Sequence, residues 1–291
     1  MNVSERFLAL LENIALTDPQ QADGIAKHHG VRRCLNSHYW NQNSDSNNSM
    51  LVGSWGKSTE IRPPRDVDVL FELPRDVYDR YQNRPGNKQS QLLQEVKRVL
   101  AASYPNTELS GDGQVVVVRF STCAVEVVPA FELTTGQYYI CDTNANGRYK
   151  AIDPKAEIQH VSTSNSLSNG NTRHLIRMAK CWQGFCNVPL KSFHIELLTI
   201  KFLETWSYRG NSAMWYDWMV RDFFRYLQRN KNTYIFVPGT SEILSVGDAW
   251  ASRVDTAEQR ATKACEHESK NEGIEAGVMW RYLFDEYIPV Y

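Results

Sequence analysis

Residues 53–73 read GSWGKSTEIRPPRDVDVLFEL, a glycine-containing turn followed by a polar stretch and a strand candidate. The strand candidate at 66–73 begins with alternating polar and apolar residues, a pattern typical of a half-buried strand. Because residues i and i+2 of a strand point to the same face, Asp66 and Asp68 present two carboxylates side by side, and Val67 and Val69 point into the core. This stretch therefore predicts a sheet with paired carboxylates on one face.

The rest of the chain predicts a mixture of strands and helices. Two β-branched stretches, VVVVRF at 115–120 and AVEVVPAF at 124–131, are separated by a Ser-Thr-Cys turn and predict an antiparallel hairpin. Helical spacing of apolar residues appears at 3–16, at about 20–38 and at 90–104, and from about residue 170 the pattern is helical. We therefore expect an α+β protein whose sheet-bearing lobe and helical lobe enclose a ligand site in the cleft between them.

Composition narrows the class of protein. The 291 residues are 42% hydrophobic and 22% charged, and the formal net charge of -1 gives no global attraction to nucleic acid or to an anionic membrane. No apolar run approaches the roughly 20 residues that span a bilayer, and Glu5 and Glu12 interrupt the N-terminal apolar pattern. The six cysteines contain no Cys-x-x-Cys pair and indicate reduced thiols. We expect a soluble cytoplasmic protein with no membrane partner.

Three carboxylates are candidates for metal binding. Asp66 and Asp68 repel each other unless a cation lies between them, and Mg²⁺ takes carboxylate oxygens together with substrate phosphates. The alternative for a lone Asp-x-Asp is a solvent-facing strand edge. Glu126 lies within an apolar strand, where a carboxylate must be paired or bound to metal. A salt bridge to Arg119 is the alternative there, whereas three such carboxylates on neighbouring strands suit two-metal nucleotidyl transfer.

The turn before the first strand has the features of a phosphate site. Glycines such as Gly53 let the backbone approach a polyphosphate, and the Ser54 hydroxyl can hold terminal phosphates. Gly56-Lys57-Ser58 also suggests a P-loop, but Leu51 stands where that motif requires glycine. Pro63-Pro64 follow where its helix should run, so we reject the P-loop interpretation.

The helical half offers a second anion site. Arg173, Arg177 and Lys180 fall at i, i+4 and i+7 and form a cationic stripe on one helix face. Pro189 ends that segment, and Ser192 stands at a plausible N-cap of the next helix, where free N–H groups favour anions. The alternatives are a solvated face for the stripe and a plain cap for the serine.

Together these residues resemble one known family. The stretch at 53–73, AVEVVPAF, and RMAKCW with PLKSFHIELL are similar to the bacterial cGAS/DncV-like nucleotidyltransferases (CD-NTases) of the DNA polymerase β superfamily. The resemblance implies a polymerase β-like nucleotidyltransferase lobe with a small mixed sheet, packed against a helical lobe. We assign the catalytic lobe to residues 1–150 and the helical lobe, which completes the nucleotide pocket, to residues 151–291.

The resemblance also implies the metal ligands. Asp66 and Asp68 would bind two Mg²⁺ ions, with Mn²⁺ as an alternative, and Glu126 would bind the metal beside the attacking hydroxyl. The third position is usually Asp in the family, and Glu126 adds a methylene that carries its oxygens about 1.5 Å further.

The nucleotide-binding residues follow from the same resemblance. Ser54, with Gly53, would hold the β- and γ-phosphates of the donor nucleotide. Lys180 and Ser192 would hold the triphosphate from the helical lobe, and Asp153 falls where the family lines the base site.

The function implied is synthesis of a cyclic di- or trinucleotide messenger from NTPs such as ATP, with release of pyrophosphate, in CBASS anti-phage signalling. Its partners would be NTP substrates and a downstream effector protein that the product activates. We expect no DNA activator, because the chain lacks a zinc-binding insertion and an excess of positive charge. Two alternatives remain: nucleotidyl transfer to RNA or a small molecule, and an inert module that binds nucleotide.

Overall fold

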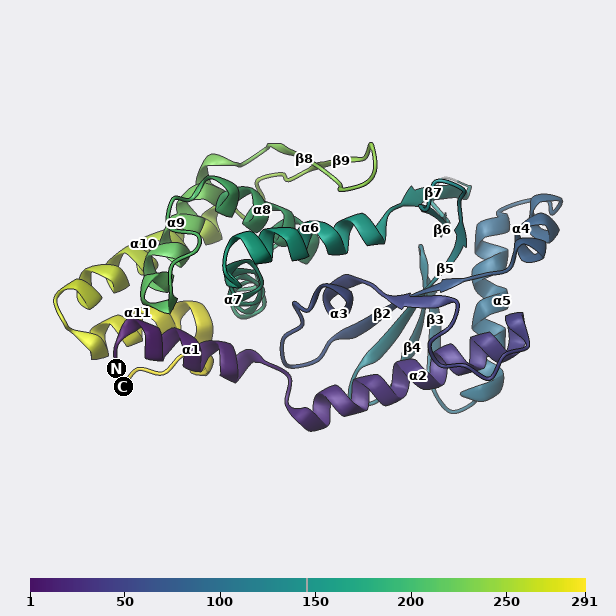
Figure 1. The fold of residues 1–291 in the computed structure, drawn as a ribbon, viewed down its shortest axis with the longest axis horizontal. Coiled ribbons are helices and arrows are strands. Elements are labelled where there is room, and N and C mark those ends of the chain that lie inside the picture. The colour runs from purple at the N-terminus through teal and green to yellow at the C-terminus, as the bar shows by residue number, and fades with distance from the viewer. Residues whose placement is uncertain (145) are drawn as a thin grey trace. The chain divides into compact units, whose positions relative to one another are not determined.

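The computed structural model describes residues 1–144 and 146–291, and the chain forms two compact units (Figure 1). The sheet unit comprises Leu16–Ile158 and Pro238–Thr240. The helical unit comprises Met1–Ala15, Gln159–Val237 and Ser241–Tyr291.

The sheet unit is built around a seven-stranded mixed sheet. Its main path follows the order β1 (Ser49–Leu51), β2 (Asp66–Glu72), β5 (Ala124–Glu132), β4 (Val115–Arg119), β3 (Glu108–Asp112). Two further strands, β6 (Tyr138–Asp142) and β7 (Arg148–Ile152), extend from β5. Only the β2–β5 pair is parallel among the described ladders; the others are antiparallel. The predicted strand at 66–73 and the predicted hairpin of β4 and β5 are both confirmed.

Helices cover one face of this sheet. The unit contains α2 (Asp18–Trp40), α3 (Gly53–Lys57), α4 (Arg75–Gln82), α5 (Lys88–Ser103) and the start of α6 (Pro154–Leu167). The valines that alternate with the acidic residues on β2 and β5 pack against apolar residues of α2, α4 and α5. Val67, Val69, Val125 and Val127 are fully buried there. The alternation thus leaves the opposite face of both strands to the carboxylates.

The sequence pattern did not reveal every strand. The short strands β1, β3, β6 and β7 lack a regular alternation, and β3 contains the polar run ELSGD. Their structure comes from ladder pairing with neighbours that are distant in the sequence, and a local pattern does not carry that information.

All six cysteines are free thiols, as predicted.

The helical unit combines helices with one small hairpin. Its helices are α1 (Val3–Ile14), the remainder of α6 from Gln159 on, α7 (Asn171–Phe185), α8 (Ser192–Thr205), η1 (Ala213–Trp215), α9 (Tyr216–Arg229), α10 (Ala251–Ser269), α11 (Gly273–Phe284) and η2 (Asp285–Tyr287). The hairpin pairs β8 (Tyr234–Phe236) with β9 (Ile243–Ser245). Across residues 1–144 and 146–291, the helices all fall short of the combined length and hydropathy that a membrane crossing requires.

The first helix belongs with the C-terminal half of the chain. Phe7 and Leu10 of α1 are fully buried, and Phe7 packs edge-on against Trp280. Arg6 is also buried, donating to Glu268 at 2.9 Å and to the carbonyl of Gly273. The compact units therefore divide the chain differently from the boundary at residue 150 that we drew. The assignment of a catalytic lobe to residues 1–150 and of a helical lobe to residues 151–291 stays a prediction.

A buried carboxyl makes the stability of the helical unit depend on pH. Asp217 of α9 is 5% exposed, and burial raises the pKa of its carboxyl from 3.8 to about 6. A raised pKa means that the folded state holds the proton more tightly, so stability falls as the pH rises from about 4 to about 6. Above that window the folded protein carries a buried charge that costs at most about 3 kcal/mol.

We therefore expect Asp217→Asn to raise the free energy of unfolding by about 1–2 kcal/mol at pH 7.5. The gain should shrink as the pH is lowered toward 4, because the wild-type carboxyl is then protonated. Urea unfolding at pH 7.5, 6 and 4.5 measures this, with the exposed Glu275→Gln of α11 as the control. A pH-independent difference would show that removal of the buried charge is not the cause.

Candidate active site

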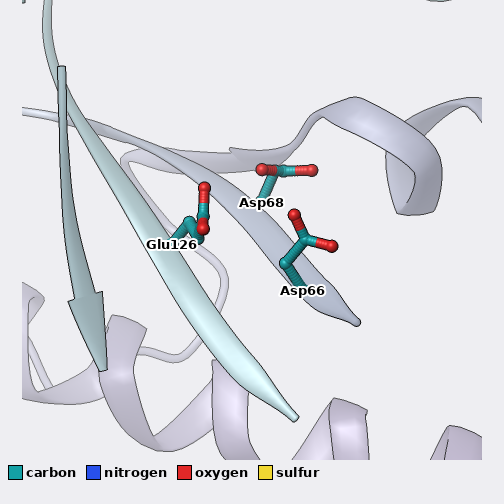
Figure 2. Close-up of side chains that lie close together, drawn as sticks. All are labelled: Asp66, Asp68 and Glu126. Atoms are coloured by element: carbon teal, nitrogen blue, oxygen red, sulfur yellow. The ribbon is translucent and has the colours of Figure 1, made fainter. Parts of the chain in front are cut away.

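Three carboxylates meet on the open face of the sheet (Figure 2). Asp66 and Asp68 lie on β2, and Glu126 lies on β5 directly opposite Asp68 in the parallel ladder. One oxygen from each carboxylate lies within 4.8 Å of the others. The structure thus brings together the three residues that the sequence proposed as metal ligands.

The cluster has the donor atoms and the spacing for a divalent cation. Mg²⁺ binds oxygens at about 2.0–2.1 Å, so two ligands on opposite sides of one ion lie about 4.2 Å apart. The observed limit of 4.8 Å is close to that span, so small side-chain rotations suffice to bring all three oxygens onto one ion. Arg119, the alternative partner for Glu126, instead pairs with Glu108 at 3.5 Å.

The electrostatics of Glu126 fit the same interpretation. Burial raises the pKa of its carboxyl, the carboxylates of Asp66 and Asp112 raise it further, and Arg119 acts in the opposite direction. In the absence of a cation, Glu126 therefore loses its proton less readily than a carboxyl in water does. A divalent ion competes with that proton, so metal binding at this cluster should weaken as the pH falls.

A glycine makes room for one of the acidic side chains. Gly53 has φ +55, and a Cβ at this position would overlap the Oδ2 atom of Asp68. The adjoining Val52 N–H donates to the carbonyl of Asp68 at 3.0 Å, which ties the turn to β2. Gly53 is therefore required both for the backbone conformation and for the approach of Asp68.

The remaining residues of the turn have distinct places. Ser54 is the second residue of α3 and is partly exposed, in the same unit as the carboxylates. The Lys57 ammonium is buried and pairs with Glu157 of α6 at 2.9 Å. It anchors α6 to α3, which agrees with the rejection of a P-loop.

Asp153 caps a helix in the structure. Its Oδ1 accepts from the N–H of Ala156 at 2.9 Å, at the start of α6. Gly239 packs so closely on Asp153 that a Cβ there would meet its Oδ2 at 2.5 Å. The predicted contact of Asp153 with a nucleotide stays a prediction.

Lys180 lies in the helical unit and already has an acidic neighbour. Its ammonium pairs with Glu196 of α8 at 2.6 Å, and the two side chains are 7% and 5% exposed. Arg173 and Arg177, which complete the predicted cationic stripe on α7, are partly exposed. The stripe is therefore buried at Lys180 and partly exposed at Arg173 and Arg177.

The prediction that Ser192 is an N-cap is wrong. Ser192 is the first residue of α8, and the N-cap is Lys191, which makes no side-chain cap. The Ser192 hydroxyl instead donates to the Oε1 atom of Gln183 on α7 at 3.1 Å. This partner draws the hydroxyl toward the neighbouring helix and away from the helix start.

Comparison with known proteins identifies the family. Residues 1–165 match the model of the Second Messenger Oligonucleotide or Dinucleotide Synthetase (SMODS) domain. The chain belongs to the SMODS family. It is 21% identical over 271 residues to a Bacillus cereus (strain VD146) protein named "Probable cyclic nucleotide synthase", and the match covers 81% of each chain.

Solved structures show the same fold. Escherichia coli CdnC, in its complex with HORMA-deltaN, matches with a TM-score of 0.75 and 17% identity, covering 98% of each chain. Vibrio cholerae DncV, a cyclic AMP-GMP synthase solved with the linear intermediate pppA(3′,5′)pG, matches with a TM-score of 0.71 and 12% identity. That match covers 96% of this chain and 94% of DncV. The predicted α+β, polymerase β-like CD-NTase fold is confirmed.

The SMODS assignment confirms the resemblance and the enzyme class. The chain is a nucleotidyltransferase of the cyclic oligonucleotide synthase class. The sequence analysis did not single out Glu196 and Gln183, the residues that contact Lys180 and Ser192. Glu196 could have been found, because it is a lone carboxylate within the apolar run IELLTI, one helical turn after Ser192. Gln183 offered no such signal.

Proposed function

We propose that this SMODS enzyme joins NTPs into a cyclic di- or trinucleotide in a Mg²⁺-dependent reaction that releases pyrophosphate. The observation that supports the proposal most directly is the convergence of Asp66, Asp68 and Glu126 within 4.8 Å. We further propose that the product serves anti-phage (CBASS) signalling in the cytoplasm by activating a downstream effector protein, with no DNA activator.

The carboxylates would hold two divalent ions, with Mn²⁺ as an alternative to Mg²⁺. When bound, such ions supply positive charge to the attacking ribose hydroxyl and to the departing pyrophosphate. Asp66 and Asp68 would bind both ions, and Glu126 would bind the one beside the attacking hydroxyl. Gly53 keeps Asp68 in place by leaving room for its carboxylate.

The other predicted residues would bind the nucleotide. Ser54 would donate its hydroxyl to the β- or γ-phosphate of the donor, at a turn where Gly53 lets the backbone approach. Lys180 and Ser192 would hold the triphosphate from the helical unit, and Asp153 would contact the nucleotide near its base. The ribose hydroxyl of one nucleotide would attack the α-phosphorus of the other and lose its proton to solvent, so that a new P–O bond forms, the bond to pyrophosphate breaks and pyrophosphate departs.

Incubation with α-labelled NTPs and Mg²⁺ tests the proposal. We expect pyrophosphate release and a labelled product that resists phosphatase, and mass spectrometry of that product identifies its bases and ring size. Label that migrates with added RNA would support transfer to RNA instead. Thermal stabilisation by NTPs without turnover in any NTP mixture would support an inert nucleotide-binding module.

A further inference from the structure

Two polar contacts join α7 and α8 in the helical unit. Lys180 on α7 pairs with Glu196 on α8, and Gln183 on α7 accepts a hydrogen bond from Ser192 on α8. Lys180 and Gln183 are three residues apart, and Ser192 and Glu196 are four apart, so each pair lies on one face of its helix. The two residues proposed to bind the triphosphate thus each have a partner on the opposite helix.

Stability alone does not explain the Lys180–Glu196 pair. Both side chains are almost completely buried, at 7% and 5% exposure, and their Nζ and Oε1 atoms are 2.6 Å apart. Burial of two charges has a desolvation cost that often equals or exceeds their attraction, so an apolar pair of similar volume would serve the fold as well. A buried ion pair between α7 and α8 can also orient a side chain that binds a ligand.

We propose that Glu196 is the positioning residue for the triphosphate, an inference that rests on the proposed function. Its carboxylate accepts one N–H of the Lys180 ammonium and fixes the direction of that side chain. An ammonium group has three N–H donors, and the carboxylate of Glu196 takes one of them along a fixed direction. The pair also keeps a cation in a buried position where an isolated charge would be unfavourable.

Gln183 makes the second of the two contacts between α7 and α8. Its Nε2 group donates to the carbonyl of Leu190, which orients the amide so that Oε1 faces the Ser192 hydroxyl. The turn between α7 and α8 and the first residue of α8 are thereby fixed to α7. Lys180 is thus held in place before any nucleotide binds, which lowers the entropic cost of binding one. The Ser192 hydroxyl has a single proton, so it must leave Gln183 before it can donate to a phosphate.

Kinetics of Glu196 variants test the inference. Glu196→Gln keeps the shape of the side chain and removes its charge, so it should raise the KM for each NTP that the wild type turns over by about tenfold and change kcat by less than about threefold. Glu196→Asp keeps the charge and should recover at least part of the loss in KM. Glu204→Gln, an exposed carboxylate near the other end of α8, is the matched control. Rates are measured well below the melting temperature of the least stable variant.

Inorganic tripolyphosphate with Mg²⁺ provides a second readout that needs no turnover. It should raise the melting temperature of the wild type and of Glu204→Gln, and the rise should be smaller in Glu196→Gln. A folded Glu196→Gln protein with an unchanged or lower KM, or with a loss confined to kcat, would overturn the inference.

The two readouts separate this inference from the proposed function. If the wild type releases no pyrophosphate, the proposed function fails and the tripolyphosphate shifts alone decide the role of Glu196. If the wild type releases pyrophosphate but tripolyphosphate stabilises Glu196→Gln as much as the wild type, the function stands and the inference is wrong. Absence of any shift in an active wild-type protein would also reject it.

Discussion

Asp68→Asn is expected to reduce pyrophosphate release from NTPs by about 10³-fold, because it removes the charge of a proposed ligand to both metal ions. Asparagine has almost the same shape, so the side chain still fits beside Gly53 and the fold should be retained. The measurement is the initial rate of pyrophosphate release at saturating Mg²⁺ and NTP. Thermal unfolding of the variant checks that its structure is intact.

The matched control for this variant is Asp76→Asn, which removes an exposed carboxylate from α4 in the same unit. Its rate should equal that of the wild type. A Mn²⁺ titration adds an independent test, since Asp68→Asn should bind the ion more weakly and Asp76→Asn should not. Activity within tenfold of the wild type in Asp68→Asn would rule out the carboxylate cluster as the catalytic centre.

Gly53→Ala is expected to cost roughly 10²-fold in activity, although it adds only one methyl group. The new Cβ would overlap Oδ2 of Asp68, so either the turn or the carboxylate must move. The positive φ of +55 adds backbone strain of about 1 kcal/mol for alanine. The loss should appear in kcat, because the displaced group belongs to the proposed metal site.

Gly113→Ala separates the two effects of that substitution. Gly113 has a nearly equal φ of +58, but an added Cβ there meets nothing within 4 Å. This variant should lose a similar amount of stability and keep its activity. Equal activity losses in both variants would show that backbone strain, and not the contact with Asp68, explains the effect.

The acidic cluster could be predicted from the sequence because its geometry follows from local rules. Alternation places Asp66 and Asp68 on one face of β2, and the valines between them identify the buried face. Glu126 follows the same rule on β5. That these strands are direct neighbours with Asp68 opposite Glu126 depends on the ladder register, which the local pattern did not predict. The resemblance to a known family implied only that the three carboxylates share the metal ions.

The contacts between distant elements could not be predicted from local patterns. Ser192 has the residue type of an N-cap, but its hydroxyl bonds to Gln183 across the α7–α8 contact. Lys180 was recognised as a cation, whereas the carboxylate that holds it lies sixteen residues away on another helix. Such pairs depend on how the helices pack against each other. The tertiary contact can therefore override a local preference such as that of serine for the N-cap position.

The division of the chain has a consequence for how this protein can be dissected. The polypeptide passes between the units after residues 15, 158, 237 and 240. No single cut in the gene therefore separates one whole unit from the other, and a fragment ending near residue 150 would expose the apolar face of its own first helix to water. Exchange of parts with relatives by recombination at one breakpoint should likewise be poorly tolerated, which favours inheritance of the whole coding region as one piece.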